Sequence, residues 1–224
     1  MMKALMFDLD DTLFLEGDFI ASGYRAVAHY VSACCGANPG DVFLTMLNTL
    51  SAHGRREVLR VVKRRFSPPG LAVADLVQIY RRHEPRISVL PGYGALLLRL
   101  GRRHKLGILT DGLPEVQHRK IRALGLDRVV DGIVCTWDLG IERQKPDPAG
   151  FLRLLSLLGV PSWDALYIGD NPGKDRVGAA NAGVRFVQVC HGRPNKVRAQ
   201  RDEAGHCARI ASLHELPKFL ESFG

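Results

Sequence analysis

Apolar residues follow two different spacings along the chain, and each spacing predicts a different kind of element. Residues 4–7 form a short apolar run that ends at Asp8, which is typical of a buried strand. From about residue 18 the apolar positions recur every three or four residues, as in Ile20, Tyr24 and Val27. That spacing places them on one face of an amphipathic helix.

Further helical patterns follow this first helix. One helix is expected to begin at Asp41 as its N-cap, one covers about 55–65, and one begins near Asp75. The Pro68-Pro69-Gly70 break separates the last two. No strand pattern appears in this region, so the sequence predicts an all-helical domain over residues 17–86.

Beyond residue 87, strand patterns alternate with helical ones. The strands are expected at 106–109, 132–135, 165–168 and 185–189. The helices are expected at 93–103, 114–124, 148–158 and 213–223, with a further one that follows the strand at 165–168 and ends near Gly183. Such alternation is typical of a parallel sheet with helices on both faces. We predict an α/β fold: a doubly wound, Rossmann-like core of residues 1–16 and 87–224, with residues 17–86 inserted after the first strand. Residues 192–208 show little periodicity, and no element is assigned to them.

Composition narrows the class of protein. With 224 residues, 46% apolar and 24% charged, the chain fits a globular protein and not a disordered one. No apolar stretch approaches the ~18 residues of a membrane span, and the first apolar run stops too early for a signal peptide. The cysteines are odd in number and lack C-x-x-C spacing, so we expect reduced, mostly buried thiols and a cytoplasmic location. The oligomeric state stays open.

The net charge of +8 comes from 31 Lys and Arg against 23 Asp and Glu. A basic protein invites a nucleic-acid interpretation, because lysine and arginine neutralise phosphates. Here the basic residues fall in short bursts without interleaved aromatic residues, and the aromatic content is only 7%. We therefore expect no nucleic-acid partner and interpret the charge as solvated helix faces.

Polar side chains gather where the predicted strands end, which is where parallel sheets bind ligands. They are Asp8, Asp10, Asp11, Thr12, Thr110, Asp111, Asp170, Asn171 and Asp175, with Lys145 in a loop before a helix. Clustered carboxylates repel one another and require a cation. Because the donors are oxygens without a His or Cys cluster, they favour Mg²⁺ over zinc. Together with a lysine and a hydroxyl, such a site suits a phosphoryl group.

Four of these segments resemble, in order, the motifs of the haloacid dehalogenase-like hydrolase superfamily. They are the D-x-D-x-T motif at 7–13, Thr110-Asp111-Gly112, Lys145-Pro146 and the segment 169–175. The helical insert resembles the family's cap domain. The resemblance implies a Mg²⁺-dependent phosphatase that hydrolyses a small phosphorylated metabolite, such as a sugar phosphate or a nucleoside monophosphate.

The resemblance also implies roles for individual residues. Asp8 would be the nucleophile that carries the phosphoryl group, and Asp10 would be the acid and base. Thr110, the Asp111 backbone N–H and Lys145 would bind the transferring phosphoryl group.

For the metal, the resemblance implies three ligands: the Asp8 and Asp170 carboxylates and the Asp10 backbone carbonyl. Asp175 would lie behind them and orient Lys145 or a metal-bound water.

Simpler structural roles remain open for several of these residues. Asp11 and Asp111 also fit turn residues that satisfy backbone groups, and Asp175 fits a helix cap. Thr110 also fits a plain residue at a strand end.

Other functions also remain open. Asp10 argues for phosphoryl transfer and against dehalogenation, since that reaction needs no acid at this position. The motifs do not separate a phosphatase from a phosphomutase. A basic binding protein without catalytic activity is the alternative from another class.

Overall fold

The computed structural model describes residues 2–66, 68–191 and 207–222. Its contacts divide the chain into two compact units. The larger unit comprises residues 1–16 and 88–224, and the smaller one comprises residues 17–87. Each unit has a hydrophobic core of its own.

The larger unit is built on a parallel sheet, which has six strands within the described residues. The strands are β1 (Ala4–Phe7), β2 (Lys105–Thr110), β3 (Gly132–Cys135), β4 (Ala165–Gly169), β5 (Arg185–Val189) and β6 (Cys207–Ile210). Their order is β3-β2-β1-β4-β5-β6, and Ala4 lies opposite both Lys105 and Ala165. Because the order reverses direction at β1, the predicted doubly wound α/β fold is confirmed.

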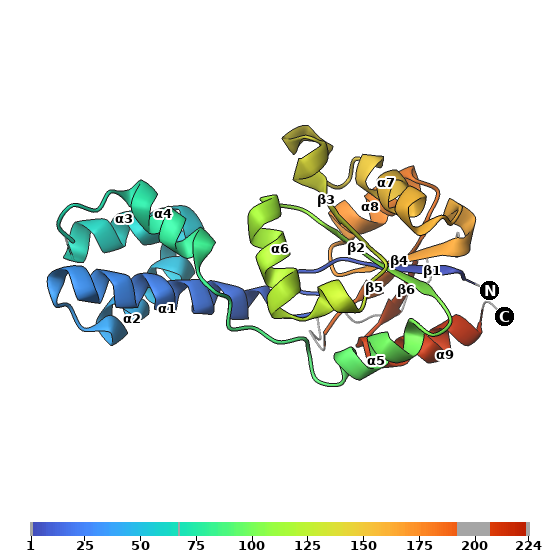
Figure 1. Cartoon of the computed structure of the whole chain (residues 1–224), viewed down its shortest axis with the longest axis horizontal. Coiled ribbons are helices and arrows are strands. Elements are labelled where there is room, and N and C mark those ends of the chain that lie inside the picture. The colour runs from blue at the N-terminus through green and yellow to red at the C-terminus, as the bar shows by residue number, and fades with distance from the viewer. Residues whose placement is uncertain (1, 67, 192–206, 223–224) are drawn as a thin grey trace. The chain divides into compact units, whose positions relative to one another are not determined.

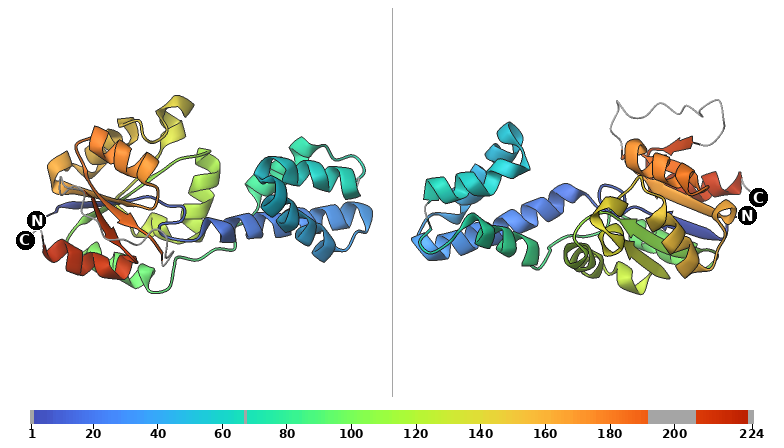
Figure 2. Two further views of the ribbon diagram at one scale, coloured as in Figure 1. Left: turned by 180° about the vertical axis from the view of Figure 1, so that it is seen from behind. Right: turned by 90° about the horizontal axis from the view of Figure 1, so that it is seen from above.

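Helices cover both faces of this sheet. They are α5 (Tyr93–Leu100), α6 (Pro114–Ala123), α7 (Ala149–Leu158), α8 (Val177–Asn181) and α9 (Leu216–Glu221). The views agree that α7 and α8 lie on one face, with α5 and α9 on the other (Figure 1 and Figure 2). Several predicted helices are longer than the observed ones: a π-helical turn, Pro172–Arg176, precedes α8, and a 3₁₀ turn, Leu213–Glu215, precedes α9.

One strand, β6, was not predicted. It begins within residues 192–208, to which the sequence assigned no element, and extends to Ile210, while residues 192–206 lie outside the described residues. Cys207–Ile210 pairs in parallel with Phe186–Val189 of β5. A four-residue strand at the edge of a sheet owes its structure to the neighbouring strand, so its own sequence carries little signal.

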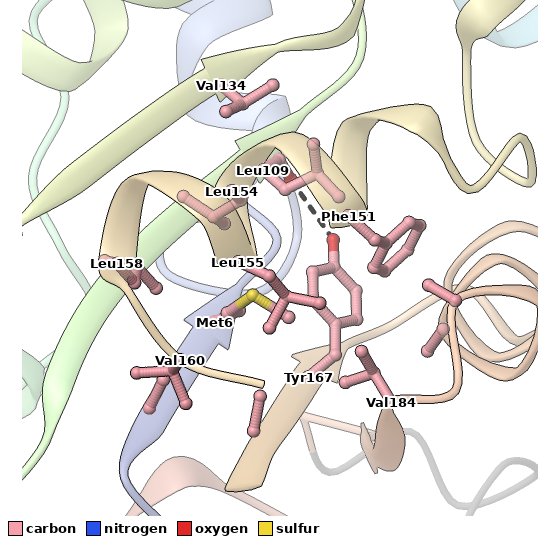
Figure 3. Close-up of a cluster of buried hydrophobic side chains, with 14 of the residues drawn as sticks. Met6, Leu109, Val134, Phe151, Leu154, Leu155, Leu158, Val160, Tyr167 and Val184 are labelled. Carbon is pink, nitrogen blue, oxygen red and sulfur yellow. Dashed lines mark hydrogen bonds between the residues drawn. The ribbon is translucent and has the colours of Figure 1, made fainter. Parts of the chain in front are cut away.

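The core beneath the carboxyl ends of the strands centres on Tyr167 of β4 (Figure 3). Its ring packs edge-on against Phe151 of α7, with the ring centroids 4.7 Å apart. Its hydroxyl donates a hydrogen bond of 3.1 Å to the Leu109 carbonyl of β2. Every residue of β1 and β4 is buried, as expected of strands covered on both faces. The central strands therefore form a fixed platform for the side chains that follow them.

Helices are the regular secondary structure of the smaller unit's described residues, and short loops connect them. It consists of α1 (Glu16–Cys35, whose first residue belongs to the larger unit), α2 (Pro39–His53), α3 (Arg55–Phe66) and α4 (Val73–Arg82). The expected N-cap at Asp41 is wrong, because the Asn38 side chain accepts the Gly40 N–H at 2.8 Å and Pro39 occupies the first turn. Asp75 likewise lies inside α4, where its carboxylate accepts the Ala72 N–H at 2.7 Å.

Two expectations from composition also meet the structure. No helix among the described residues is long and apolar enough to cross a membrane. Cys135 and Cys190 are buried, but Cys34 is half-buried and Cys35 is exposed. The expectation of mostly buried thiols therefore holds for Cys135 and Cys190 and fails for the pair at the end of α1.

Candidate active site

A cavity of about 260 Å³ opens at the carboxyl ends of β1, β2 and β4. Every residue for which the family resemblance implied a role lines it: Asp8, Asp10, Thr110, Asp111, Lys145, Asp170 and Asp175. Thr12, which the sequence placed in the same polar cluster, is not among the lining residues. Asp11, Glu16, Asn171 and Lys174 complete the lining. The structure thus brings together polar residues from four separate segments of the larger unit.

Lys145 lies at the buried centre of the cavity wall. Its Nζ lies 2.6 Å from Asp8 Oδ1 and 2.8 Å from Asp175 Oδ1. It also donates a hydrogen bond of 3.1 Å to the Tyr167 hydroxyl, which in turn donates a hydrogen bond to the Leu109 carbonyl. Burial acts to lower the pKa of Lys145, but the Asp8 and Asp175 carboxylates outweigh it and raise that pKa well above its usual value. Lys145 is therefore a permanent cation in this site.

The carboxylates around Asp8 outnumber the neighbouring cation, Lys145. Burial raises the pKa of Asp8, Lys145 acts to lower it, and the Asp175 carboxylate raises it further. Asp8, Asp170 and Asp175 each offer one carboxylate oxygen, and these three oxygens lie within 4.8 Å of one another. A set of oxygen donors with excess negative charge suits a hard divalent cation such as Mg²⁺.

The Asp10 carboxylate lies apart from that group and is held by α6. Its Oδ1 pairs with Lys120 Nζ at 2.7 Å, and its Oδ2 accepts a hydrogen bond of 2.9 Å from Gln117 Nε2. Gln117 Nε2 also donates to Thr110 Oγ1 through a short hydrogen bond. Because Thr110 Oγ1 accepts from Gln117, its own proton is available to a ligand in the cavity.

Sequence reasoning did not identify Gln117 and Lys120. Both side chains are buried, and they lie three residues apart on one face of α6. The available signal was Ile121, a buried apolar residue one turn after Gln117. It marks the face of α6 that packs inward, and two polar residues on such a face point to a site.

Asp111 holds two loops together. Its Oδ1 accepts hydrogen bonds from the Thr136 hydroxyl at 2.9 Å and from the Lys145 backbone N–H at 3.1 Å. Its Oδ2 lies 3.1 Å from Lys174 Nζ. The Asp111 side chain therefore binds backbone and side-chain groups of neighbouring loops, the structural role that the sequence left open. Asp111 also lines the cavity.

Asp11 and Asp175 also bind backbone groups. Asp11 adopts a left-handed conformation with φ of 54°, and its carboxylate accepts the Glu16 N–H at 2.9 Å. Asp175 Oδ2 accepts the Asn171 N–H at 2.9 Å while its other oxygen contacts the site lysine. A Cβ at Gly169 would collide with the Asp175 carboxylate, so only glycine fits where β4 ends.

Comparison with known proteins identifies the family to which the chain is similar. The profile of the haloacid dehalogenase-like hydrolase family matches residues 5–189. The chain is 28% identical over 249 residues to phosphoserine phosphatase of Thermus thermophilus, covering 96% of this chain and 98% of that protein. It is 28% identical over 214 residues to glyceraldehyde 3-phosphate phosphatase of Methanopyrus kandleri, covering 91% and 90%. The solved structure of a 2-haloacid dehalogenase from Pseudomonas syringae superposes with a TM-score of 0.69 at 25% identity, covering 100% of both chains.

Proposed function

The chain belongs to the haloacid dehalogenase-like hydrolase family and is a phosphatase of that family, and we propose that it hydrolyses a small phosphorylated metabolite with Mg²⁺ through an aspartyl phosphate at Asp8. One observation carries this proposal: Asp10 lines the same cavity as Asp8 and Lys145. Dehalogenation requires no acid at that position, whereas the departure of an alcohol from phosphorus does.

The proposed hydrolysis has two steps, transfer of the phosphoryl group to Asp8 and its release to water. In the first, an Asp8 carboxylate oxygen attacks phosphorus and the bond from phosphorus to the ester oxygen breaks, while Asp10 gives that oxygen a proton. In the second, Asp10 takes a proton from a water molecule whose oxygen attacks the aspartyl phosphate. Inorganic phosphate leaves, and Asp8 is restored as a carboxylate.

Lys145 and Thr110 bind the phosphoryl group during both steps. Lys145 is a buried cation beside Asp8, so it offsets negative charge on the nucleophile and on the phosphoryl oxygens. The Thr110 hydroxyl donates a hydrogen bond to a phosphoryl oxygen, because its oxygen already accepts one from Gln117. The Asp111 backbone N–H supplies a further donor at the end of the same strand.

Mg²⁺ would be held by the Asp8 and Asp170 carboxylates and the Asp10 backbone carbonyl, with Asp175 orienting Lys145. When bound, the ion would neutralise charge on the phosphoryl oxygens and draw the ester toward Asp8. The carboxylate oxygens of Asp8, Asp170 and Asp175 within 4.8 Å of one another support this assignment.

The helical unit, residues 17–87, is proposed to act as the family's cap and to select the leaving group. Its exposed Arg55 and Arg56, at the start of α3, are candidates for contacts with an anionic substrate. Replacing both with glutamine is expected to change the ranking of substrates while activity on the poorest substrate stays within about twofold. An unchanged ranking would remove these residues from substrate selection.

The test measures phosphate release from sugar phosphates, nucleoside monophosphates, phosphoserine and glyceraldehyde 3-phosphate. Each substrate is assayed with Mg²⁺, with a chelator, and with Asp8→Asn as the control. Mg²⁺-dependent release that falls by about 10³-fold or more in Asp8→Asn supports the proposal. Release that survives in Asp8→Asn contradicts it. Transfer of the phosphoryl group to another hydroxyl of the substrate, in place of water, would identify a mutase.

A further inference from the structure

A second cluster of metal-ligating side chains lies outside the catalytic cavity. It consists of His118 on α6, Cys135 at the end of β3, and Asp138 in the 3₁₀ turn Thr136–Leu139. One ligand atom from each residue lies within 4.8 Å of the other two. None of the three lines the cavity that holds Asp8.

We propose that His118, Cys135 and Asp138 form a binding site for a thiophilic divalent cation of the Zn²⁺ class. His118 Nε2 lies 3.8 Å from Cys135 Sγ. Tetrahedral zinc, with Zn–S of about 2.3 Å and Zn–N of about 2.0–2.1 Å, holds such a pair of atoms about 3.6 Å apart. The present separation therefore needs only a small adjustment to admit the ion.

The donor set distinguishes this cluster from the catalytic carboxylates. Nitrogen, sulfur and oxygen donors select zinc or cobalt, whereas a set of oxygens alone selects magnesium. Among the described residues, the Asp138 carboxylate takes part in no hydrogen bond or ion pair, and its residue is exposed. It is thus free to complete a site that is open to solvent on one side, with water as a fourth ligand.

Binding a cation at this cluster requires the Cys135 thiol to lose its proton. Burial and the nearby Asp138 carboxylate raise the pKa of the Cys135 thiol to about 12. A bound cation would displace that proton into solvent and offset the negative charge of both side chains. The proposed ion therefore replaces the proton that the cluster otherwise keeps on sulfur.

The ligands neighbour residues that position the catalytic groups. His118 follows Gln117, which binds Asp10 and Thr110, and Cys135 precedes Thr136, whose hydroxyl binds Asp111. A cation at this cluster would connect α6 to the end of β3, next to the hydrogen bonds of Gln117 and of Thr136. The inference does not depend on the proposed phosphatase reaction, because it concerns metal binding alone.

Co²⁺ is the probe, added to the full-length protein in excess Mg²⁺. A cysteine thiolate bound to Co²⁺ gives a ligand-to-metal charge-transfer band in the near ultraviolet, which carboxylates do not produce. We expect one band that saturates at about one equivalent and is displaced by Zn²⁺. The band should disappear in Cys135→Ser and require at least tenfold more Co²⁺ in His118→Gln. It should persist in Cys35→Ser, the control at an exposed cysteine.

Two results would overturn the proposal: no charge-transfer band in the wild-type protein, or a band that survives in Cys135→Ser. Asp138→Asn keeps the test decisive if the buried Cys135→Ser variant does not fold, because the Asp138 side chain is exposed. This variant is expected to bind Co²⁺ at least tenfold more weakly. Unchanged affinity would also contradict the proposed site.

Discussion

The Lys120 ammonium lies 2.7 Å from Asp10 Oδ1, and the two side chains are 6% and 23% exposed. The ammonium also lies over the Phe14 ring, 5.9 Å from its centroid. With the hydrogen bond from Gln117, this contact holds the Asp10 carboxylate at both oxygens. Lys120 is therefore a positioning residue for the proposed acid and base.

Replacing Lys120 with methionine is expected to lower kcat by about 10–100-fold, a part of what a positioned acid and base supplies. KM should change by less than about threefold, since Lys120 does not line the cavity. Lys120→Arg, which keeps the charge, should restore part of the loss. Steady-state kinetics, corrected for the fraction of folded enzyme, provide the measurement. If both variants lose total activity equally while kcat per folded enzyme is unchanged, Lys120 has only a structural role.

Removal of the divalent cation should abolish activity, and Asp170→Asn should raise the Mg²⁺ concentration needed for half-maximal activity by about tenfold or more. The physical reason is the loss of one of three carboxylates whose oxygens lie within 4.8 Å of one another. The matched control is Asp11→Asn, which lines the same cavity but uses its side chain to bind the Glu16 N–H. A Mg²⁺ titration in which both variants shift equally would contradict the assignment of Asp170.

Tyr167→Phe keeps the ring in the core and removes a hydroxyl with two partners. The Leu109 carbonyl would lose its hydrogen bond of 3.1 Å, and Lys145 would lose one of its acceptors. We expect the free energy of unfolding to fall by about 1–2 kcal/mol, because buried polar groups are left unsatisfied. Urea denaturation measures this loss, and an unchanged midpoint at unchanged slope would show that the hydroxyl contributes nothing.

Asp131, which contacts the first residues of β2, should make the free energy of unfolding depend on pH. Its burial acts to raise the pKa, but hydrogen bonds from Lys105 Nζ at 2.7 Å and the Leu106 N–H at 2.8 Å lower it overall. A carboxyl whose pKa is lowered on folding stabilises the protein above its unfolded pKa of about 3.9, and this contribution is lost as the pH falls through the folded pKa.

Asp131→Asn is therefore expected to cost about 1 kcal/mol at pH 7, a value that allows for the exposure of this pair. The difference from the wild-type protein should shrink as the pH falls below about 4. Denaturant unfolding across this range provides the measurement. A difference that stays constant with pH would mean that the carboxylate charge plays no part.

Gly23→Ala in α1 should destabilise the helical unit, although alanine favours helices over glycine by about 1 kcal/mol. A Cβ at Gly23 would lie 2.5 Å from ring atoms of Tyr80. That ring is packed against Phe19 and Tyr24, with centroids 5.8 and 5.7 Å away, so it cannot move aside freely. We expect a loss of about 1–3 kcal/mol.

The control for this prediction is Gly17→Ala, in the same helix, where a Cβ meets nothing within 4 Å. It should leave stability unchanged or raise it slightly. Thermal unfolding of both variants gives the comparison. Equal stability of the two would show that the contact between Gly23 and Tyr80 yields without cost.

The sequence alone was sufficient for the fold class and for most of the residues that line the cavity, although it singled out neither Glu16 nor Lys174. Hydrophobic spacing is a local property, so the alternation of strands and helices could be read along the chain. The carboxyl ends of parallel strands meet at one edge of a sheet. The sequence therefore predicts that Asp8, Thr110 and Asp170 lie together, with the loop residue Lys145 beside them.

Only the tertiary structure decided which partner each side chain meets. The pairing of Asp10 with Lys120, and the meeting of His118, Cys135 and Asp138, depend on how α6 is rotated against the sheet. Residue spacing determines which positions share a helix face, but packing against neighbouring elements determines what that face touches. The same holds for β6, whose edge pairing depends on β5 being in place.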